Sequence, residues 1–184
     1  SSGDRLRARE RTTRPRLLVV DDRVPTSDAG SGYPRAHALL SLLRQRGYPI
    51  TFFPSYDATP YQPWLRELQQ AGIEMICDGR AFEELASERA GSYDVVLVSR
   101  PHNFGAVRRA VTRWLHRAVV IYDAEALFFV REEAHTAVAE ALPLAELARK
   151  QREELDLLRF AHLVVTVSER EKRLPADAAP AFKG

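Results

Sequence analysis

LLVVDD, at residues 17–22, is the stretch that decides the fold. A short apolar run that ends in polar residues is typical of a strand covered on both faces of a parallel sheet. The next segment has apolar residues at helical spacing from Ala36 to Leu43, and Gly47 is a residue of the type that ends such a helix. A strand followed by an amphipathic helix is the repeating unit of an α/β fold.

The same alternation continues along the chain. Pro54 is expected to end the second strand, and Pro143 to divide the helical segment 124–160, because proline cannot donate the helical hydrogen bond. Ser168 and Glu171 match a capping box for a last helix. Further strands are expected at residues 50–53, 73–76, 95–98, 119–122 and 163–167. The sequence predicts an α/β, Rossmann-like three-layer domain, with a mostly parallel sheet of about six strands and helices on both faces.

Three parts of the chain are distinguished by composition. Residues 1–16 are interpreted as a tag remnant and an Arg-rich flexible leader, because Ser1-Ser2-Gly3 resembles the scar of an expression vector. Residues 17–173 are expected to form the Rossmann-like domain. Residues 174–184 contain two prolines and no periodic pattern, so they are expected to be a linker or a truncated hinge.

Composition excludes several classes of protein. The formal charge is +2, and the leader carries +4 of it, so the remaining −2 predicts no nucleic-acid-binding surface. Cys77 is the only cysteine, which rules out an intramolecular disulfide and favours a reducing compartment. No apolar run approaches the roughly 20 residues of a membrane span. We expect a cytoplasmic protein that is at most peripheral at the inner face of the membrane.

Motifs of metal sites and serine hydrolases are missing from the sequence. The five histidines are scattered without i, i+4 spacing, so no metal site is expected. No serine lies in a G-x-S-x-G elbow. Candidate site residues therefore have to come from the loops that follow the strands.

Four of these loops are polar, and helix capping alone explains one of them, Ser168-Glu169. In the first, Gly30-Ser31-Gly32 precedes a helix, where the backbone can approach a phosphate or a sugar closely. Arg100 and His102 follow the fourth strand, and Asp123 and Glu125 follow the fifth. A flexible glycine loop and a helix cap at Asp123 are the plain alternatives. Taken together, the loops predict a common cleft at the carboxyl edge of the sheet.

Four segments resemble the N-terminal, acceptor-side domain of family 4 retaining glycosyltransferases, which have two facing Rossmann-like domains. The similar segments are VVDDRVPTSDAGSGYPRAHALLSLLRQRGYPITFFP, YDVVLVSRP, VVIYDAEALFFVREE and ELDLLRFAHLVVTVSEREK. These segments are spread along residues 17–172, and the resemblance is taken to extend over nearly all of that range. The resemblance implies a hexosyltransferase that takes a nucleotide-sugar donor and a glycan or lipid-linked acceptor in polysaccharide biosynthesis.

The resemblance also implies roles for individual residues. The loop Gly30-Ser31-Gly32 would face the donor diphosphate and shape the acceptor pocket, with basic Arg35 beside it. Asp123 and Glu125 would be the acidic pair near the reacting sugar, for positioning more than for acid/base catalysis. Arg100 and His102 would line a further acceptor-side loop.

The same resemblance implies that an important part of the enzyme is absent from this chain. Most donor contacts would come from a second, C-terminal domain, so the chain alone is expected to be inactive. Neither a metal nor another cofactor is implied.

The residues themselves are also compatible with other classes of protein. A degenerate response-regulator receiver would explain the pair Asp21 and Asp22, although Ser99 replaces the phosphate-accepting aspartate. Another nucleotide-binding Rossmann domain, for a nicotinamide or a methyl donor, would explain the architecture. Such a domain usually has a cleaner glycine motif and an acid at the end of the second strand, where Pro54 is expected here. A scaffold without a ligand is the last alternative.

Overall fold

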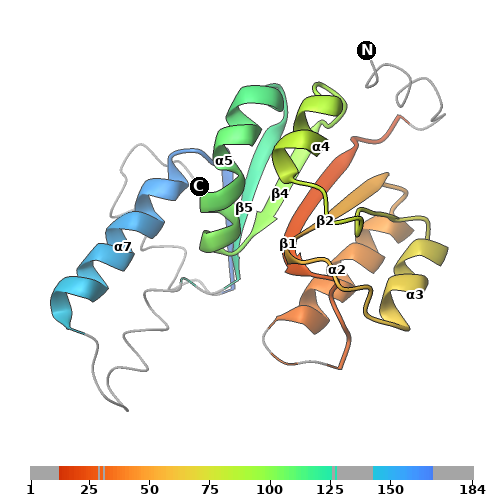
Figure 1. Ribbon diagram of the computed structural model, residues 1–184, viewed down its shortest axis with the longest axis horizontal. Helices are drawn as coiled ribbons and strands as arrows, with labels where there is room; N and C mark the ends of the chain where they lie inside the picture. Colours follow the sequence, from red (N-terminus) through yellow and green to blue (C-terminus); the bar gives the residue numbers. More distant parts are fainter. Residues whose placement is uncertain (1–12, 29, 31, 126, 128–142, 168–184) are drawn as a thin grey trace.

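A parallel sheet of six strands forms the centre of the molecule, with helices on both of its faces (Figure 1). The computed structural model describes residues 13–28, 30, 32–125, 127 and 143–167. The strand order is β3-β2-β1-β4-β5-β6, and every neighbouring pair is parallel. The strands are β1 (Leu17–Arg23), β2 (Ile50–Asp57), β3 (Glu74–Met75), β4 (Val95–Ser99), β5 (Val119–Glu125) and β6 (Leu163–Thr166). The predicted fold class is confirmed.

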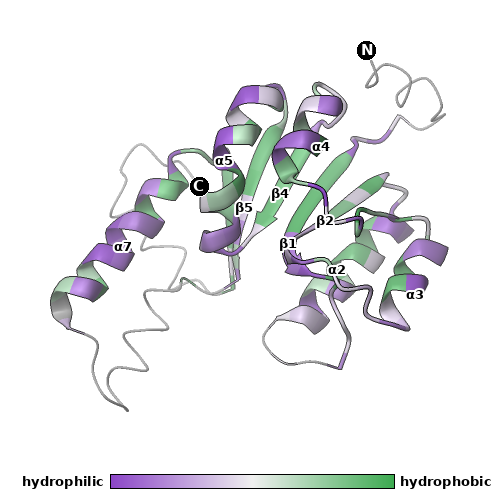
Figure 2. Ribbon diagram, viewed as in Figure 1, coloured by the Kyte–Doolittle hydropathy of each residue, from purple (hydrophilic) through white to green (hydrophobic). Residues whose placement is uncertain are grey.

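The helices are divided between the two faces of the sheet. One face is covered by α2 (Tyr33–Gln45) and α3 (Trp64–Gln70); the other is covered by α4 (Phe82–Glu88), α5 (Pro101–Trp114) and α7 (Leu144–Leu158). Successive residues of β1 serve the two cores in turn, because side chains alternate across a strand. Figure 2 shows the resulting pattern, with apolar strands between helices whose polar residues face outward.

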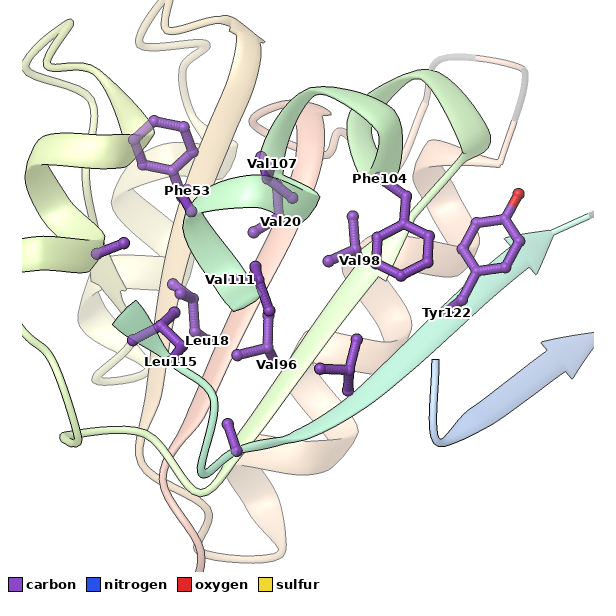
Figure 3. Close-up of a cluster of buried hydrophobic side chains, with 14 of the residues drawn as sticks. Leu18, Val20, Phe53, Val96, Val98, Phe104, Val107, Val111, Leu115 and Tyr122 are labelled. Atoms are coloured by element: carbon purple, nitrogen blue, oxygen red, sulfur yellow. The ribbon is translucent and has the colours of Figure 1, made fainter. Parts of the chain in front are cut away.

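The core between the sheet and α5 is dominated by aromatic and branched side chains (Figure 3). The ring of Phe104 stacks on that of Tyr122, with 5.2 Å between the centroids. The hydroxyl of Tyr122 donates a hydrogen bond of 3.0 Å to Glu154 of α7, so this buried oxygen is paired. Burial of such side chains supplies about 1.5–3 kcal/mol each, which holds α5 firmly on the sheet.

The strand order reverses between β1 and β4. From β1 the chain moves outward to β2 and β3, and α4 then returns it to the other side of β1, where β4, β5 and β6 follow in the opposite direction. In open parallel sheets, ligands bind at such a reversal, beyond the carboxyl ends of the strands. The topology therefore predicts a ligand site at the carboxyl ends of β1 and β4.

Some element boundaries differ from the sequence prediction. β2 continues past Pro54 to Asp57, because β3 pairs only with Thr51 and Phe52, and the missing N–H of Pro54 leaves no β3 partner unsatisfied. β3 has two residues instead of four, and β1 includes the acidic pair. Asp123 lies within β5 and does not cap a helix.

Other predictions concern the end of the chain. Pro143 directly precedes α7, as a proline that begins a helix should. The helix expected before it, and the capping box at Ser168, fall outside the described residues. No described helix is both long enough and apolar enough to cross a bilayer.

Candidate functional site at the carboxyl edge of the sheet

Charged and polar side chains from two strands, two helices and the residue between β4 and α5 meet where β1, β4 and β5 end. The carboxyl cluster, as we call it, consists of Asp21, Asp22, Arg35, Arg100, His102, Asn103, Asp123 and Glu125. The parallel register places the ends of the three strands side by side, because Asp21 follows Val20, which pairs with Val98 of β4, and Ser99 pairs with Asp123 of β5. Alternation along β1 then sends Asp21 toward the α2 face and Asp22 toward the α5 face.

Asp22 is held by the first turn of α5. Its Oδ1 accepts a hydrogen bond of 2.8 Å from Asn103 and lies 2.5 Å from Nε2 of His102, while its Oδ2 accepts one of 2.5 Å from Arg100. Burial alone would raise the pKa of Asp22, but the hydrogen bonds from His102 and Asn103 and the charge of Arg100 hold it below its usual value. Asp22 is therefore an ionised carboxylate whose acceptors are already used.

Asp123 is satisfied in the same way from the opposite face. Arg35 of α2 reaches it with two hydrogen bonds, of 2.6 and 3.1 Å, in the forked geometry that suits a carboxylate. The backbone N–H of Glu125 donates a third, of 3.2 Å. The hydrogen bond to Asp123 raises the pKa of Arg35 above its already high usual value. This pair fixes α2 to the end of β5.

Arg100 lies at the centre of the carboxyl cluster. Its guanidinium is 3.3 Å from Asp21, 2.5 Å from Asp22 and 3.6 Å from Glu125, and its side chain is only 8% exposed. The backbone of Arg100 has a φ of +73°, a value that few residues other than glycine adopt. A single buried cation thus compensates three carboxyl groups.

Asp21 and Glu125 differ from the other two carboxyl groups because each has a buried oxygen without a hydrogen-bond partner. These atoms are Oδ2 of Asp21 and Oε1 of Glu125. Burial raises the pKa of Asp21 to about 7, although the charge of Arg100 opposes the change. Burial likewise raises the pKa of Glu125, again against Arg100. The carboxyl cluster thus contains two satisfied carboxylates and two unsatisfied ones.

Aromatic rings adjoin the carboxyl cluster on the side of β2. The guanidinium of Arg23, the last residue of β1, lies 4.3 Å from the ring centroid of Tyr33 and 4.8 Å from that of Tyr61. Arg100 lies 4.6 Å from the same Tyr33 ring. Tyr56, near the end of β2, is 86% exposed. This edge therefore offers flat apolar faces beside charged groups.

The structure brings together most of the residues that the sequence singled out. Arg35, Arg100, His102, Asp123 and Glu125 contact one another or Asp22, and Gly32 adjoins Glu125. Gly30 would have open space around an added Cβ, and Ser31 lies outside the described residues. Their roles as site residues stay predictions.

Several members of the carboxyl cluster were missed by sequence reasoning. Asp21 and Asp22 were considered only for the receiver alternative, and Asn103 was not considered. The signal for the acidic pair was its position directly after the first strand of a parallel sheet. Asn103 carried no such signal, because its contacts with Asp22 and Ser55 join residues far apart in sequence.

Gly32 provides a test of how tightly the carboxyl cluster is packed. It has a φ of +86°, and a Cβ added to it would lie 2.6 Å from Oε2 of Glu125. Gly47 has a nearly equal φ of +83° and open space around its Cβ position. We expect Gly32→Ala to lower the free energy of unfolding more than Gly47→Ala does, by about 1 kcal/mol beyond the shared backbone strain. Urea titration of both variants measures the difference.

The control for Gly32→Ala removes the side chain that it meets. In a Glu125→Ala background the two glycine substitutions should become nearly equal, because the close contact no longer exists. A persistent excess for Gly32→Ala in that background would mean that its cost has another source.

Two further observations concern metal ions and a separate cavity. Within the described part of the chain, no group of three or more potential ligands is placed to hold a metal ion. A cavity of about 210 Å³ lies elsewhere, between α5 and the residues around His162, and it is largely apolar. The charged residues and this cavity are therefore separate features.

Comparison with known proteins supports the fold and little else. No family model and no curated protein matches the chain. Among solved structures, it is similar to a wide-type short-chain dehydrogenase/reductase from Veillonella parvula, determined in complex with NADP. The TM-score is 0.50, the identity is 16%, and the match covers 83% of this chain and 68% of the other. At this identity the likeness shows a shared Rossmann-like architecture.

The expectation of a glycosyltransferase is corrected by these comparisons. The structural neighbour is an oxidoreductase in complex with NADP, and no glycosyltransferase family model matches. The inferred nucleotide-sugar donor, the glycan or lipid-linked acceptor and the role in polysaccharide biosynthesis are withdrawn with it. The physical reason is that the similar segments are largely strands and amphipathic helices, which recur in many α/β domains. The alternative of another nucleotide-binding Rossmann domain agrees better with the neighbour.

Proposed function

We propose that this chain is a nucleotide-binding domain whose ligand lies at the carboxyl edge of the sheet, over the ends of β1 and β4. The observation that carries the proposal is the position of the carboxyl cluster at the reversal of strand order. In the described part of the chain, four residues at this edge have a buried polar atom without a hydrogen-bond partner: Asp21, Arg23, Thr26 and Glu125. Such atoms are uncommon in folded proteins and call for a partner.

The surroundings suit parts of a nucleotide. Carboxyl groups accept hydrogen bonds from ribose hydroxyls, and the exposed ring of Tyr56 offers a face for a base. Asp57 ends β2, where dinucleotide-binding domains have the acid that binds a ribose, but its carboxylate already accepts hydrogen bonds from the hydroxyl of Tyr61 and the N–H of Thr59. These features favour a ligand with a sugar and a flat ring.

The residues do not fit the diphosphate of a dinucleotide such as NADP. In dinucleotide-binding folds the diphosphate lies beside the glycines at the N-terminus of the first helix. Here the carboxylate of Glu125 occupies the space next to Gly32, at the start of α2. Asp21 and Asp22 add further carboxyl groups at the end of β1, which would repel phosphate. We therefore derive no hydride-transfer step for this chain.

The receiver alternative has little structural support. β3 pairs with β2 at the edge of the sheet, so this chain has one strand and one crossover more than a receiver domain has. Ser99, which ends β4, offers a hydroxyl where that alternative requires a phosphate-accepting carboxylate.

Nucleotide binding can be tested on the whole chain by NMR. ¹H–¹⁵N spectra would be recorded during titration with NAD, NADP and the common nucleosides and their mono-, di- and triphosphates. We expect at least one of these compounds to shift the backbone signals at the ends of β1, β4 and β5 and in the first turn of α5. Signals of Ser92 and Asp94, at the opposite edge of the sheet, serve as the internal control. Changes centred on that opposite edge, or none with millimolar ligand, would overturn the proposal.

A further inference from the structure

The four carboxyl groups of the carboxyl cluster differ in how many of their acceptors are used. Asp22 makes hydrogen bonds with Asn103, His102 and Arg100. Asp123 accepts two hydrogen bonds from Arg35 and one from the backbone N–H of Glu125. Among the described residues, Asp21 accepts a hydrogen bond only from the N–H of Asp22, at 2.7 Å, beside its ion pair with Arg100 at 3.3 Å, and its Oδ2 has no hydrogen-bond partner although the residue is 1% exposed. An ionised carboxylate can accept about four hydrogen bonds. Spare capacity is thus found on Asp21 and on Glu125.

The charge around these two groups limits which donors can complete them. Arg100 lies within 3.6 Å of both carboxyl groups, so a second cation would meet a like charge. A phosphate would meet the carboxyl groups themselves, and Asp22 adds to their negative field. A neutral donor avoids both penalties. The ribose ring of a nucleotide-class ligand supplies a pair of neutral donors, its two hydroxyl groups.

We infer that Asp21 and Glu125 are the residues that recognise this ligand, by accepting hydrogen bonds from its ribose hydroxyls, and that the site selects against a diphosphate. The inference rests on the proposed function and assigns the contacts differently from a dinucleotide site, in which the acid at the end of the second strand would bind the ribose. Neither oxygen is exposed, so binding has to displace neighbouring side chains of the carboxyl cluster.

The raised pKa values of the two groups agree with this assignment. Burial without enough donors is what raises the pKa of Asp21 to about 7 and that of Glu125 above its usual value. Asp22 also lies beside Arg100, but it makes hydrogen bonds with His102 and Asn103, and its pKa is lowered. Hydroxyl donors would do for Asp21 and Glu125 what Asn103 and His102 do for Asp22.

The experiment measures binding by isothermal titration calorimetry at pH 8, where Asp21 is ionised. The probes are adenosine, guanosine, cytidine and uridine, with the matching 2′,3′-dideoxynucleosides, the 5′-diphosphates and methyl β-ribofuranoside. We expect at least one ribonucleoside to bind, its dideoxy analogue to bind at least about tenfold more weakly, and its diphosphate to bind no more tightly than the nucleoside.

Variants assign the contact to a residue. Asp21→Asn and Glu125→Gln should each weaken binding of the ribonucleoside about tenfold or more, because a charge-assisted hydrogen bond is lost. Neither should change the weak binding of the dideoxy analogue. Asp57→Asn should leave both affinities unchanged, whereas a dinucleotide-like arrangement would make it the damaging variant. Circular dichroism confirms that each variant is folded.

The outcomes separate this inference from the proposed function. Equal binding of ribo- and dideoxynucleosides, tighter binding of the diphosphate, or an effect at Asp57 alone would overturn the inference and leave nucleotide binding intact. Binding of methyl β-ribofuranoside as tightly as any nucleoside would uphold hydroxyl recognition and contradict a nucleotide ligand. If no probe binds, here or in the NMR titration, both proposals fail.

Discussion

Asp21→Asn is expected to stabilise the protein at pH 8, by on the order of 2–4 kcal/mol, and to have almost no effect at pH 4. The pKa of Asp21 rises from 3.8 to about 7 on folding because burial disfavours the charged carboxylate. Each pKa unit corresponds to about 1.4 kcal/mol. Above pH 7 the wild-type protein must keep a poorly compensated charge in its interior, whereas asparagine stays neutral.

The sign follows from proton binding. Between pH 3.8 and about 7, the folded protein holds a proton on Asp21 that the unfolded chain has released. The contribution of Asp21 to stability is therefore complete below pH 3.8 and is lost as the pH rises through about 7. Urea unfolding of wild type and variant across this range measures the effect. A variant that is less stable than wild type at pH 8 would show that the carboxylate is ionised and well paired.

An exposed carboxylate provides the control for Asp21→Asn. Asp28 lies in the loop after β1 and is exposed, so Asp28→Asn should change stability little at either pH. A comparable gain from Asp28→Asn would point to the overall charge of the protein as the cause.

Arg100→Leu is expected to lower the free energy of unfolding by about 3–5 kcal/mol at pH 8, because it leaves buried carboxylates without their shared cation. Asp21, Asp22 and Glu125 all lie within 3.6 Å of this guanidinium. The loss should shrink toward pH 5, because Asp21, whose pKa is about 7, becomes protonated there, and burial raises the pKa of Glu125 in the same direction. Leucine keeps a side chain at a φ of +73°, so the backbone strain is the same in both proteins.

Arg80→Leu is the control, because Arg80 also pairs with more than one carboxylate. Its partners, Asp78 and Glu88, lie 2.7 and 2.9 Å away on the surface, where water screens the interaction. The loss should be far smaller and should depend little on pH. Adding Asp21→Asn to Arg100→Leu should recover part of the stability, since one unpaired charge is removed. Equal losses for the two arginine variants would contradict a central role for Arg100.

The expected fold could be predicted because it depends on local patterns. The strands of the sheet are apolar along their length and the helices repeat their apolar residues at helical spacing, so burial on both faces follows from the residues themselves. The boundaries were less predictable. Pro54 lies inside β2 because β3 is too short to pair with it, and that length is a property of the sheet.

The resemblance to glycosyltransferases illustrates the limit of this reasoning. It rested largely on segments that form β1, α2, β2, β4, β5, the end of α7 and β6, whose patterns are shared by many Rossmann-like domains. Such segments predict architecture well and ligand poorly, because a ligand is recognised by a few side chains that need not belong to them.

The sequence by itself determined that a parallel sheet would carry polar loops at its carboxyl edge, and hence where a site could lie. Only the tertiary structure decided what each side chain does there. Asp21 and Asp22 are neighbours in the chain, but they point to opposite faces of the sheet. Asp22 meets the first turn of α5 and is saturated with donors, whereas Asp21 faces the side of α2 with an oxygen unpaired. Their partners come from residues some 80 positions away, and no local pattern encodes such contacts.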